Sequence, residues 1–270
     1  MSLKSIATKS ALVVLLLHVD GACYAQDTTP EEAKQSVIYL GTEFVVDRVE
    51  NKRRDILARE LARQALLITI REELGLVACD QTLAEWPPKE ASIKHLLLTE
   101  RFTDDGQWRL QLCVEQGGDE GQIKLKRVWQ KDYEVDYGKA RQSIYAIIVP
   151  MLERDSRSVF IDALEAAGIN RSGQSRELQP DSQGADLEEM QLDVDYIKQF
   201  FSVRLAHKRD AGELPTLGLL VRGYANLALL TEHQYNAVSD AFIARSWLYA
   251  QRACAAFPES RAAIWSRAYA

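Results

Sequence analysis

An internal repeat close to the end of the chain constrains the fold more than any other feature of the sequence. Residues 219–225 read LLVRGYA and residues 264–270 read IWSRAYA, so the pattern Arg, small residue, Tyr, Ala returns after 45 residues. A period of this length is typical of a two-helix unit, since paired-helix repeats run from about 34 to about 47 residues. We therefore expect one helix over residues 217–230 and a second over residues 237–257, stopped by Pro258.

The two copies of the repeat place Gly223 and Ala268 at the same position, where a small side chain lets a paired helix approach closely. This pattern resembles the tetratricopeptide superfamily, in which a small residue in the first helix and a proline after the second are typical. The tetratricopeptide period is about 34 residues. The resemblance therefore implies a divergent, longer-helix relative of those repeats.

The same repeat supplies the candidate partner-binding residues. Arg222 and Arg267 are candidates to hold a peptide carboxylate in a bidentate manner. Tyr224, Trp265 and Tyr269 are candidates to line an aromatic groove. The competing interpretation is structural: arginines in helical repeats pair with acids between neighbouring helices, and aromatic residues at helical spacing pack in the core. We favour the structural interpretation for both sets.

The start of the chain has the three parts of a secretory signal. Lys4 and Lys9 are basic, residues 11–19 are apolar, and Ala25 ends a small-residue cleavage site. The apolar stretch is shorter than the ~20 residues that cross a bilayer. We expect cleavage after Ala25 and an exported, periplasmic protein with no transmembrane segment after cleavage. The alternative is a lipid anchor on Cys23, because the preceding Gly-Ala resembles the end of a lipobox.

A change of composition divides the rest of the chain. Residues 171–190 are rich in Ser, Gln, Gly and acids, which is typical of a linker. After the signal peptide of residues 1–25 we therefore expect an α/β domain of residues 26–170, this linker, and a helical-repeat domain of residues 191–270. Because the second copy of the repeat stops at residue 270, we expect that domain to be incomplete at its C-terminus, so that further repeats or a partner chain cover its last helix.

The hydrophobic pattern before the linker alternates between helix and strand. Residues 51–74 carry a helical stripe that ends at Gly75, and a second helix is expected over residues 138–167. Between them the pattern predicts three strands joined as an antiparallel meander, over residues 93–102, 108–115 and 122–133. The predicted class is therefore α+β: an α/β domain with a three-strand meander and flanking helices, then an all-α repeat domain.

The meander makes further predictions about single residues. Trp108 and Trp129 fall at core positions, and a shift of phase before Val128 indicates a β-bulge. Cys79 and Cys113 lie in the same predicted domain, and a bridge between them is one use of the thiols in an exported protein. The cysteines and histidines have no metal-ligand spacing, so we predict no metal site, and no motif predicts a cofactor or a catalytic residue.

The turn after the second predicted strand contains Gly117-Gly118-Asp119-Glu120, which resembles the signature of the diguanylate cyclases. Gly121 stands where that family has an aromatic residue, and the upstream nucleotide-binding segment of the family is missing. Glycine and aspartate are also the residues that a hairpin turn requires for its backbone geometry. We therefore predict a turn without chemistry.

The order of elements around the meander carries a second resemblance. A strand pair that ends in a tryptophan before an Ile-rich helix resembles the amino-terminal α/β domain of TolB and of curli-secretion-like envelope domains. The matching positions are Gly106, Leu110, Leu112, Trp129, Tyr133, Ile144, Ile148 and Leu152. The resemblance implies a fold and a tendency to bind protein, and it transfers no active-site residue.

Charge and composition narrow the function. The formal net charge of −6 argues against a nucleic-acid partner, since such proteins concentrate positive charge. We expect an exported, non-enzymatic binding or assembly module of the bacterial cell envelope, with a protein partner. The alternative is an envelope-polymer hydrolase whose carboxylates are dispersed in the sequence, because such pairs meet only in space.

Overall fold

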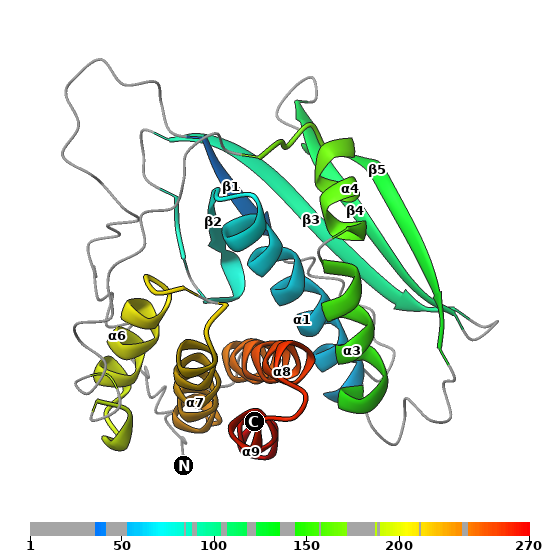
Figure 1. Ribbon diagram of the computed structural model, residues 1–270. Helices are drawn as coiled ribbons and strands as arrows, with labels where there is room; N and C mark the ends of the chain where they lie inside the picture. Colours follow the sequence, from blue (N-terminus) through cyan, green and yellow to red (C-terminus); the bar gives the residue numbers. More distant parts are fainter. Residues whose placement is uncertain are drawn as a thin grey trace, which may run out of the picture.

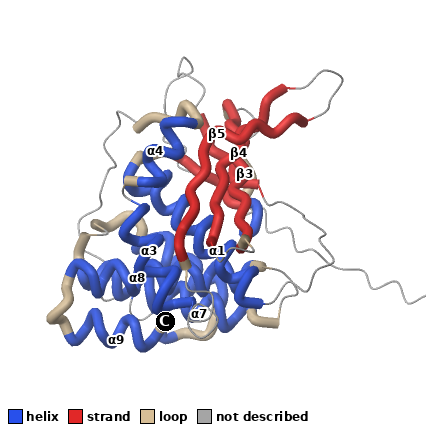
Figure 2. The backbone as a smooth tube through the Cα atoms, turned by 90° about the vertical axis from the view of Figure 1, so that its right-hand side faces the viewer, coloured by secondary structure: helices blue, strands red, loops and turns tan. Residues whose placement is uncertain are grey.

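The computed structural model shows an α+β protein in which a mixed five-stranded sheet is followed by packed C-terminal helices (Figure 1). Helices α3 and α4 lie on one side of the strands, and the C-terminal helices lie beneath (Figure 2). The residues that the structure describes are 36–41, 53–83, 85–87, 91–103, 107–117, 123–135, 144–156, 158–171, 187, 190–210, 212–233 and 237–270. The predicted signal peptide, most of the predicted linker and residues 118–122, for which a turn was predicted, lie outside them.

The sheet has the strand order β2-β1-β3-β4-β5. Strand β1 pairs in parallel with β2 and with β3, while β3, β4 and β5 pair in antiparallel. The predicted meander is therefore confirmed, and two short parallel strands extend it. The strands are Ser36–Gly41 (β1), Val77–Asp80 (β2), Ser92–Phe102 (β3), Gln107–Gly117 (β4) and Ile123–Glu134 (β5).

The predicted bulge in the third strand of the meander is also confirmed. Leu112 of β4 faces Trp129 of β5, but the next residue, Cys113, faces Arg127, so Val128 is the additional residue. Trp108 is fully buried, as predicted. Trp129 is only half-buried at the bulge, although its ring still contacts that of Phe160 at 6.4 Å between centroids.

Helix α1, Arg53–Ile68, is the central helix of the molecule and lies between the sheet and helices α3 and α8 (Figure 1). Every residue of the range 60–70 is buried, so the helix has no solvent-exposed side there. It continues into a π-helical turn, Thr69–Glu73 (η1), in which the amide of Leu74 donates to the carbonyl of Thr69. Gly75, at φ 65°, ends the helix as its sequence position predicted.

The helix expected over residues 138–167 is two helices in the structure, α3 (Ile144–Ser156) and α4 (Val159–Ala166). The expectation of one continuous helix is wrong because the two segments pack on different neighbours. Helix α3 packs on α1 and α8, whereas α4 packs on β5. Ser158 takes a non-helical backbone at φ −133° and redirects the chain between them.

The helices predicted for the repeat region are confirmed as helices. Helix α7 packs between α6 and α9, and α8 connects this layer to α1 and α3 (Figure 1). One hydrophobic cluster contains residues from both sides of the predicted linker, and the division into two domains stays a prediction. The helices are Tyr196–Ala206 (α6), Leu214–Thr231 (α7), Val238–Ala256 (α8) and Arg261–Tyr269 (α9). None of the described helices is both long and apolar enough to cross a membrane.

The hydrophobic pattern over residues 193–207 predicts a helix, confirmed as α6, that turns most of its apolar side chains inward. The predicted inward residues are Val194, Ile197, Phe200, Phe201, Val203 and Leu205. Val203 is buried as predicted, but Ile197 and Phe201 are exposed, and so is Val194 just before the helix, with 84% of its surface accessible. The polar Gln199 is buried beside Val203. The Gln199 amide donates to backbone carbonyls of the segment that precedes α6. These hydrogen bonds keep Gln199 on the buried face of the helix.

The proposed bridge between Cys79 and Cys113 is wrong, and the structure contains no disulfide among the described cysteines. Cys79 lies on β2 and Cys113 on β4, and strands β1 and β3 lie between them. Neighbouring strands are about 4.8 Å apart, so the two Cα atoms are about 14 Å from each other. A disulfide requires a Cα separation below about 7 Å.

Candidate functional site

The large apolar side chains that remain exposed are concentrated on the C-terminal helices. Of the thirteen such side chains among the described residues, ten follow residue 190 and three, Trp86, Ile93 and Leu125, precede it. The ten are Leu192, Val194, Tyr196, Ile197, Phe201, Leu229, Leu230, Ile264, Trp265 and Tyr269. Monomeric proteins rarely leave large contiguous apolar patches open to water, so these helices form the first candidate site.

Helix α9 presents the most exposed of the aromatic side chains. Arg261, Trp265 and Tyr269 are spaced four residues apart, so they form one stripe along the helix. Trp265 exposes 74% of its surface. The Tyr269 hydroxyl donates to Oδ1 of Asn226 on α7 at 2.8 Å, which shows that this stripe faces the outer side of α7.

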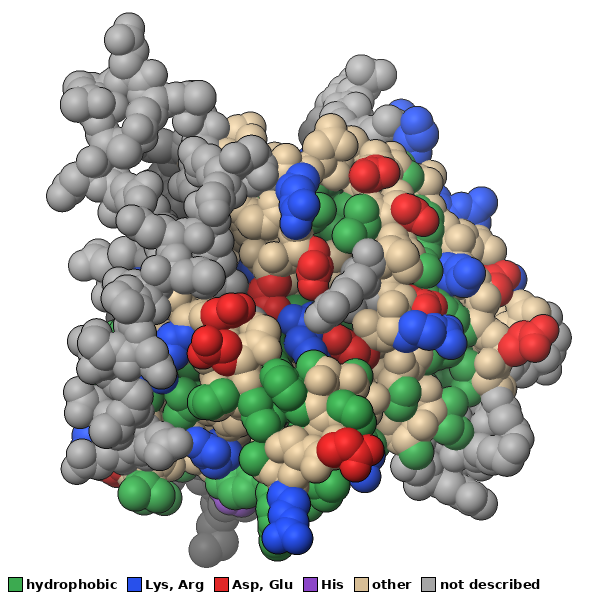
Figure 3. Space-filling view, in the orientation of Figure 1, with side chains coloured by type: hydrophobic (Ala, Val, Ile, Leu, Met, Phe, Trp, Pro, Cys, Tyr) green, Lys and Arg blue, Asp and Glu red, His purple; other side chains and the backbone are tan. Residues whose placement is uncertain are grey.

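Helix α7 forms the middle of the same surface, and α6 forms its other side. The Asn226 amide donates to Oε1 of Gln199 on α6 at 3.1 Å, so one side chain connects all three helices. Arg222, one turn before Asn226, is half-buried and donates to Oε1 of Gln191 at 3.3 Å. We call the exposed faces of α6, α7 and α9 the outer helical surface. Hydrophobic side chains lie among charged side chains of both signs along the lower edge of the molecule (Figure 3).

The structure separates the five predicted partner-binding residues. Trp265 and Tyr269 lie on the outer helical surface, and Arg222 lies beside them. Arg267 is exposed on another side of α9, near Tyr145: burial raises the pKa of Tyr145 to about 12, and the charge of Arg267 opposes that rise. Tyr224 is buried and points into the protein, so its candidacy for a groove is corrected, and the packing interpretation that the sequence favoured holds for it.

Tyr224 belongs to a second candidate site, a buried polar cluster between α1 and the C-terminal helices that the sequence did not predict. At its centre Asp80, at the end of β2, is fully buried. Its carboxylate accepts from Arg63 at 2.9 Å and from Gln64 at 2.8 Å, both on α1. Arg245 of α8 lies 3.7 Å from the same carboxylate and donates to Oε1 of Gln64 at 2.6 Å.

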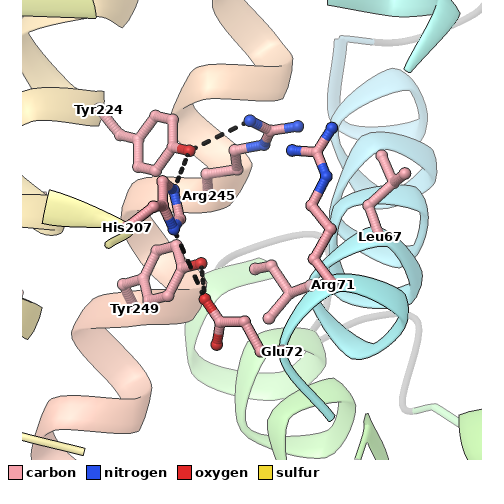
Figure 4. A pocket seen from close by; sticks show the side chains of 8 residues that line it. Leu67, Arg71, Glu72, His207, Tyr224, Arg245 and Tyr249 are labelled. Carbon is pink, nitrogen blue, oxygen red and sulfur yellow. Dashed lines mark hydrogen bonds and ion pairs between the residues drawn. The ribbon is translucent and has the colours of Figure 1, made fainter. Parts of the chain in front are cut away.

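The other half of the buried polar cluster is built around Glu72 and two tyrosines (Figure 4). Arg245 donates to the hydroxyl of Tyr224 at 3.1 Å, and this oxygen lies 2.6 Å from Nε2 of His207. The Tyr249 hydroxyl donates to Glu72 at 2.5 Å, and Arg252 pairs with the second oxygen of that carboxylate. Charged groups from α1, η1, β2 and α8 therefore meet in the interior.

The chemistry available to this cluster is limited by space and by protonation. Burial raises the pKa of both Tyr224 and Tyr249, so neither hydroxyl becomes a phenolate nucleophile near neutral pH. The pocket that the cluster lines has a volume of about 10 Å³. That is about enough for one water molecule and leaves no room for a substrate. Its lining contains one carboxylate, Glu72, so it does not provide the acid pair that the hydrolase alternative requires.

The sequence contained only a weak signal for this cluster. Glu60, Arg63 and Gln64 lie at helical spacing on α1, and Arg245, Tyr249 and Arg252 form a similar stripe on α8. Both helices carry further polar residues, so these stripes do not stand out from the sequence alone. Neither stripe identified its partner, because Asp80 and His207 come from other parts of the chain.

Comparisons with known proteins add no assignment. No protein-family model matches the chain, and a search of curated proteins finds no significant match. Among the residues that the structure describes, no group of three or more His, Cys, Asp or Glu side chains is placed to hold a metal ion.

Proposed function

We propose that this chain is an exported binding module of the bacterial cell envelope and that it binds a protein partner through the outer helical surface. The observation that carries the proposal is the position of the exposed apolar side chains, ten of thirteen of which follow residue 190. Aromatic residues and arginine are enriched at protein interfaces, and Trp265, Tyr269, Arg222 and Arg261 supply both kinds.

The energetic support comes from Trp265. A tryptophan buries about 150–250 Å² when it is covered. At about 25 cal/mol per Å² this is worth roughly 4 kcal/mol. Burial by a partner therefore recovers a large free energy that the isolated chain leaves unused. Residues of this type at the centre of an interface are the usual hot spots.

Two further parts of the proposal come from the sequence. Export is supported by the basic start, the apolar stretch and the small-residue site that precede residue 26. A divergent repeat is supported by helices α7 and α9, which carry the two copies of the motif and both pack on α8. The likeness to envelope domains of the TolB type agrees with both parts, and with a role in recognition.

The test is capture of partners from envelope extract with the exported chain and two matched tryptophan variants. Trp265→Ala and Trp86→Ala each remove one exposed indole, and 67% of the Trp86 surface is accessible on the sheet domain. We expect Trp265→Ala to weaken binding of the captured protein at least tenfold, the size typical of a tryptophan hot spot. Trp86→Ala should leave it unchanged.

The same pair of variants also defines the opposite result. Loss of binding in Trp86→Ala with retention in Trp265→Ala would assign the partner to the sheet domain and refute the proposed surface. Far-ultraviolet circular dichroism of both variants checks that neither has unfolded. We expect no change, because Trp265 is mostly solvated.

A further inference from the structure

One hydrogen-bond donor in the buried polar cluster has no acceptor in the protein. Arg245 exposes only 4% of its surface, and it lines the pocket of the cluster (Figure 4). Its Nε donates to Gln64 and its Nη1 to Tyr224. Its Nη2 is buried and has no hydrogen-bond partner among the described residues, since Oδ2 of Asp80 is 3.7 Å away. Buried polar groups are nearly always paired, so this nitrogen indicates an acceptor that comes from outside the chain.

A second guanidinium group lies beside the first. Arg71 of η1 lines the same pocket, and its guanidinium faces that of Arg245 (Figure 4). Burial and the charge of Arg245 act to lower the pKa of Arg71, although the attraction of nearby acids, chiefly Glu85, prevails and the pKa is raised. The two cations repel each other inside the protein, and an anion placed between them removes this repulsion.

The carboxylates next to Arg245 do not fully balance the cations there. Asp80 is shared by two arginines, at 2.9 Å from Arg63 and at 3.7 Å from Arg245. Glu60 lies beside Arg63, but burial raises the pKa of Glu60 to about 7, so near neutral pH it carries only part of a negative charge. Because Arg63 has the shorter contact with Asp80, the deficit of negative charge falls on Arg245.

We infer that the pocket binds one small monovalent anion, such as chloride, between the guanidinium groups of Arg245 and Arg71. The volume of about 10 Å³ admits a single species of roughly the size of a water molecule. A chloride ion is only slightly larger than water, whereas phosphate and sulfate are too large. Leu67 and Ile68 also line the pocket, and a monatomic anion can contact such apolar side chains without losing a directional hydrogen bond.

Glu72 lines the pocket as well, and its carboxylate would repel an anion if it were unpaired. Arg252 pairs with one of its oxygens, and Tyr249 donates to the other. Water is therefore the competing occupant. A water molecule can accept from Nη2 of Arg245, but it carries no charge and leaves the repulsion between Arg245 and Arg71 in place.

The test measures urea unfolding of the full chain at increasing chloride concentration, with sodium gluconate keeping the ionic strength constant. Gluconate is too large for the pocket. An ion that binds only the folded chain raises the ratio of folded to unfolded protein about tenfold for each tenfold increase in concentration above its Kd. We expect this dependence in the parent. Arg245→Met should abolish it, and Arg267→Met, at an exposed position of α9, should retain it.

Crystals grown in chloride provide a second measurement that needs no variant. We expect an anomalous peak from chlorine, recorded at long wavelength, next to Nη2 of Arg245. Density at that position without an anomalous peak identifies water and overturns the inference. A chloride dependence that is unchanged in Arg245→Met, or absent from the parent, overturns it as well. If Arg245→Met does not fold, the anomalous map of the parent decides.

Discussion

At the residue scale the protein concentrates charge where water is excluded. Asp80 and Gln64 expose none of their surface, and Arg63, Glu60 and Arg245 expose almost none. Removing charges from water costs several kcal/mol per ion, and mutual attraction repays this only when the geometry is good. The cluster therefore contributes little to the net stability of the fold. It does select one arrangement of α1 and α8, because its hydrogen bonds form only when these helices are in the observed register.

Arg245 provides the direct test of this selectivity. Arg245→Met removes the donor to Gln64 and Tyr224 and one of the cations beside Asp80. We expect the free energy of unfolding to fall by about 1–3 kcal/mol, because Gln64 and Tyr224 lose a buried hydrogen-bond partner while Asp80 keeps Arg63 and Gln64. Urea denaturation measures the change. Arg267→Met, at an exposed position of α9, should stay within about 0.5 kcal/mol of the parent.

Glu60 makes the stability of the fold depend on pH, and a substitution at this one residue isolates its contribution. Burial raises the pKa of Glu60 to about 7, against the attraction of Arg63. A carboxyl whose folded pKa is raised stabilises the fold when protonated, so its contribution is full below about pH 4.5 and is lost as the pH rises through about 7. We expect Glu60→Gln to be more stable than the parent at pH 8, by up to about 3 kcal/mol.

Thermal or urea unfolding at pH 5 and pH 8 measures this difference. At pH 5 the advantage of Glu60→Gln should be small, because the parent glutamate is then mostly protonated in the folded state. Glu259→Gln removes an exposed carboxylate and serves as control. An advantage of Glu60→Gln that is the same at both pH values would contradict the assigned titration.

The sequence predicted single residues well where one pattern governs them and poorly where two distant segments meet. Trp108 was identified as core because strand alternation alone decides its side. Helical spacing favoured packing for Tyr224, and it is buried, but nothing in its own segment indicated its contacts with His207 and Arg245 from other parts of the chain. No local period contains that information.

At the element scale the close contact between α6 and α7 depends on one glycine. A Cβ atom at Gly223 would lie 2.3 Å from Cγ2 of Val203, which is too close for any real pair of carbon atoms. The sequence correctly marked Gly223 as the small residue of its helix. It did not indicate that the close neighbour is the preceding helix rather than α8.

Two alanine substitutions on α7 separate this contact from helix propensity. Gly218→Ala should raise the free energy of unfolding by up to about 1 kcal/mol, because its nearest neighbours, at 3.5 and 3.9 Å, leave room for a methyl group. Gly223→Ala should lower it by about 1–2 kcal/mol, since overpacking outweighs the same gain in propensity. Chemical denaturation of both variants provides the comparison.

A second substitution identifies the clash itself. Adding Val203→Ala to Gly223→Ala removes the methyl groups that the new Cβ would meet. We expect the double variant to lose less stability than the sum of the two single variants. Strict additivity would show that α6 and α7 are not in the contact described.

Elements were predictable in proportion to their length and regularity. The long strands of the meander and helices α1, α7 and α8 follow strong periods, and their existence was correct. Strands β1 and β2 have 6 and 4 residues and were missed, because so few residues show no period. The break between α3 and α4 was missed because it is imposed by packing on different neighbours.

At the scale of the whole molecule the sheet and the C-terminal helices share one hydrophobic cluster. The cluster runs from Trp108 and Leu110 of β4 through Leu66 of α1 to Leu248 of α8. The sequence analysis placed a boundary at residues 171–190 on composition alone. Composition reports where the chain is polar, whereas the extent of a core depends on which helix faces meet.

Trp108 tests whether this shared core unfolds as one unit. Trp108→Ala removes a fully buried ring that contacts Phe102 and Tyr133, and should lower the free energy of unfolding by about 3–5 kcal/mol. Because α8 packs on α1, we expect fluorescence and the far-ultraviolet helical signal to be lost in one coincident transition. Persistence of the helical signal after the fluorescence change would support two independently folding domains.

The direction in which Glu72 points depends on the number of residues in the π-helical turn η1. The turn contains one residue more than an α-helical turn, and each helical residue advances the side chains by about 100°. Glu72 reaches Tyr249 and Arg252 only with that extra residue in place. In homologues that lack one residue between Ile68 and Leu74, the carboxylate would turn away from α8. Such single-residue gaps should therefore coincide, in an alignment, with the loss of Arg252.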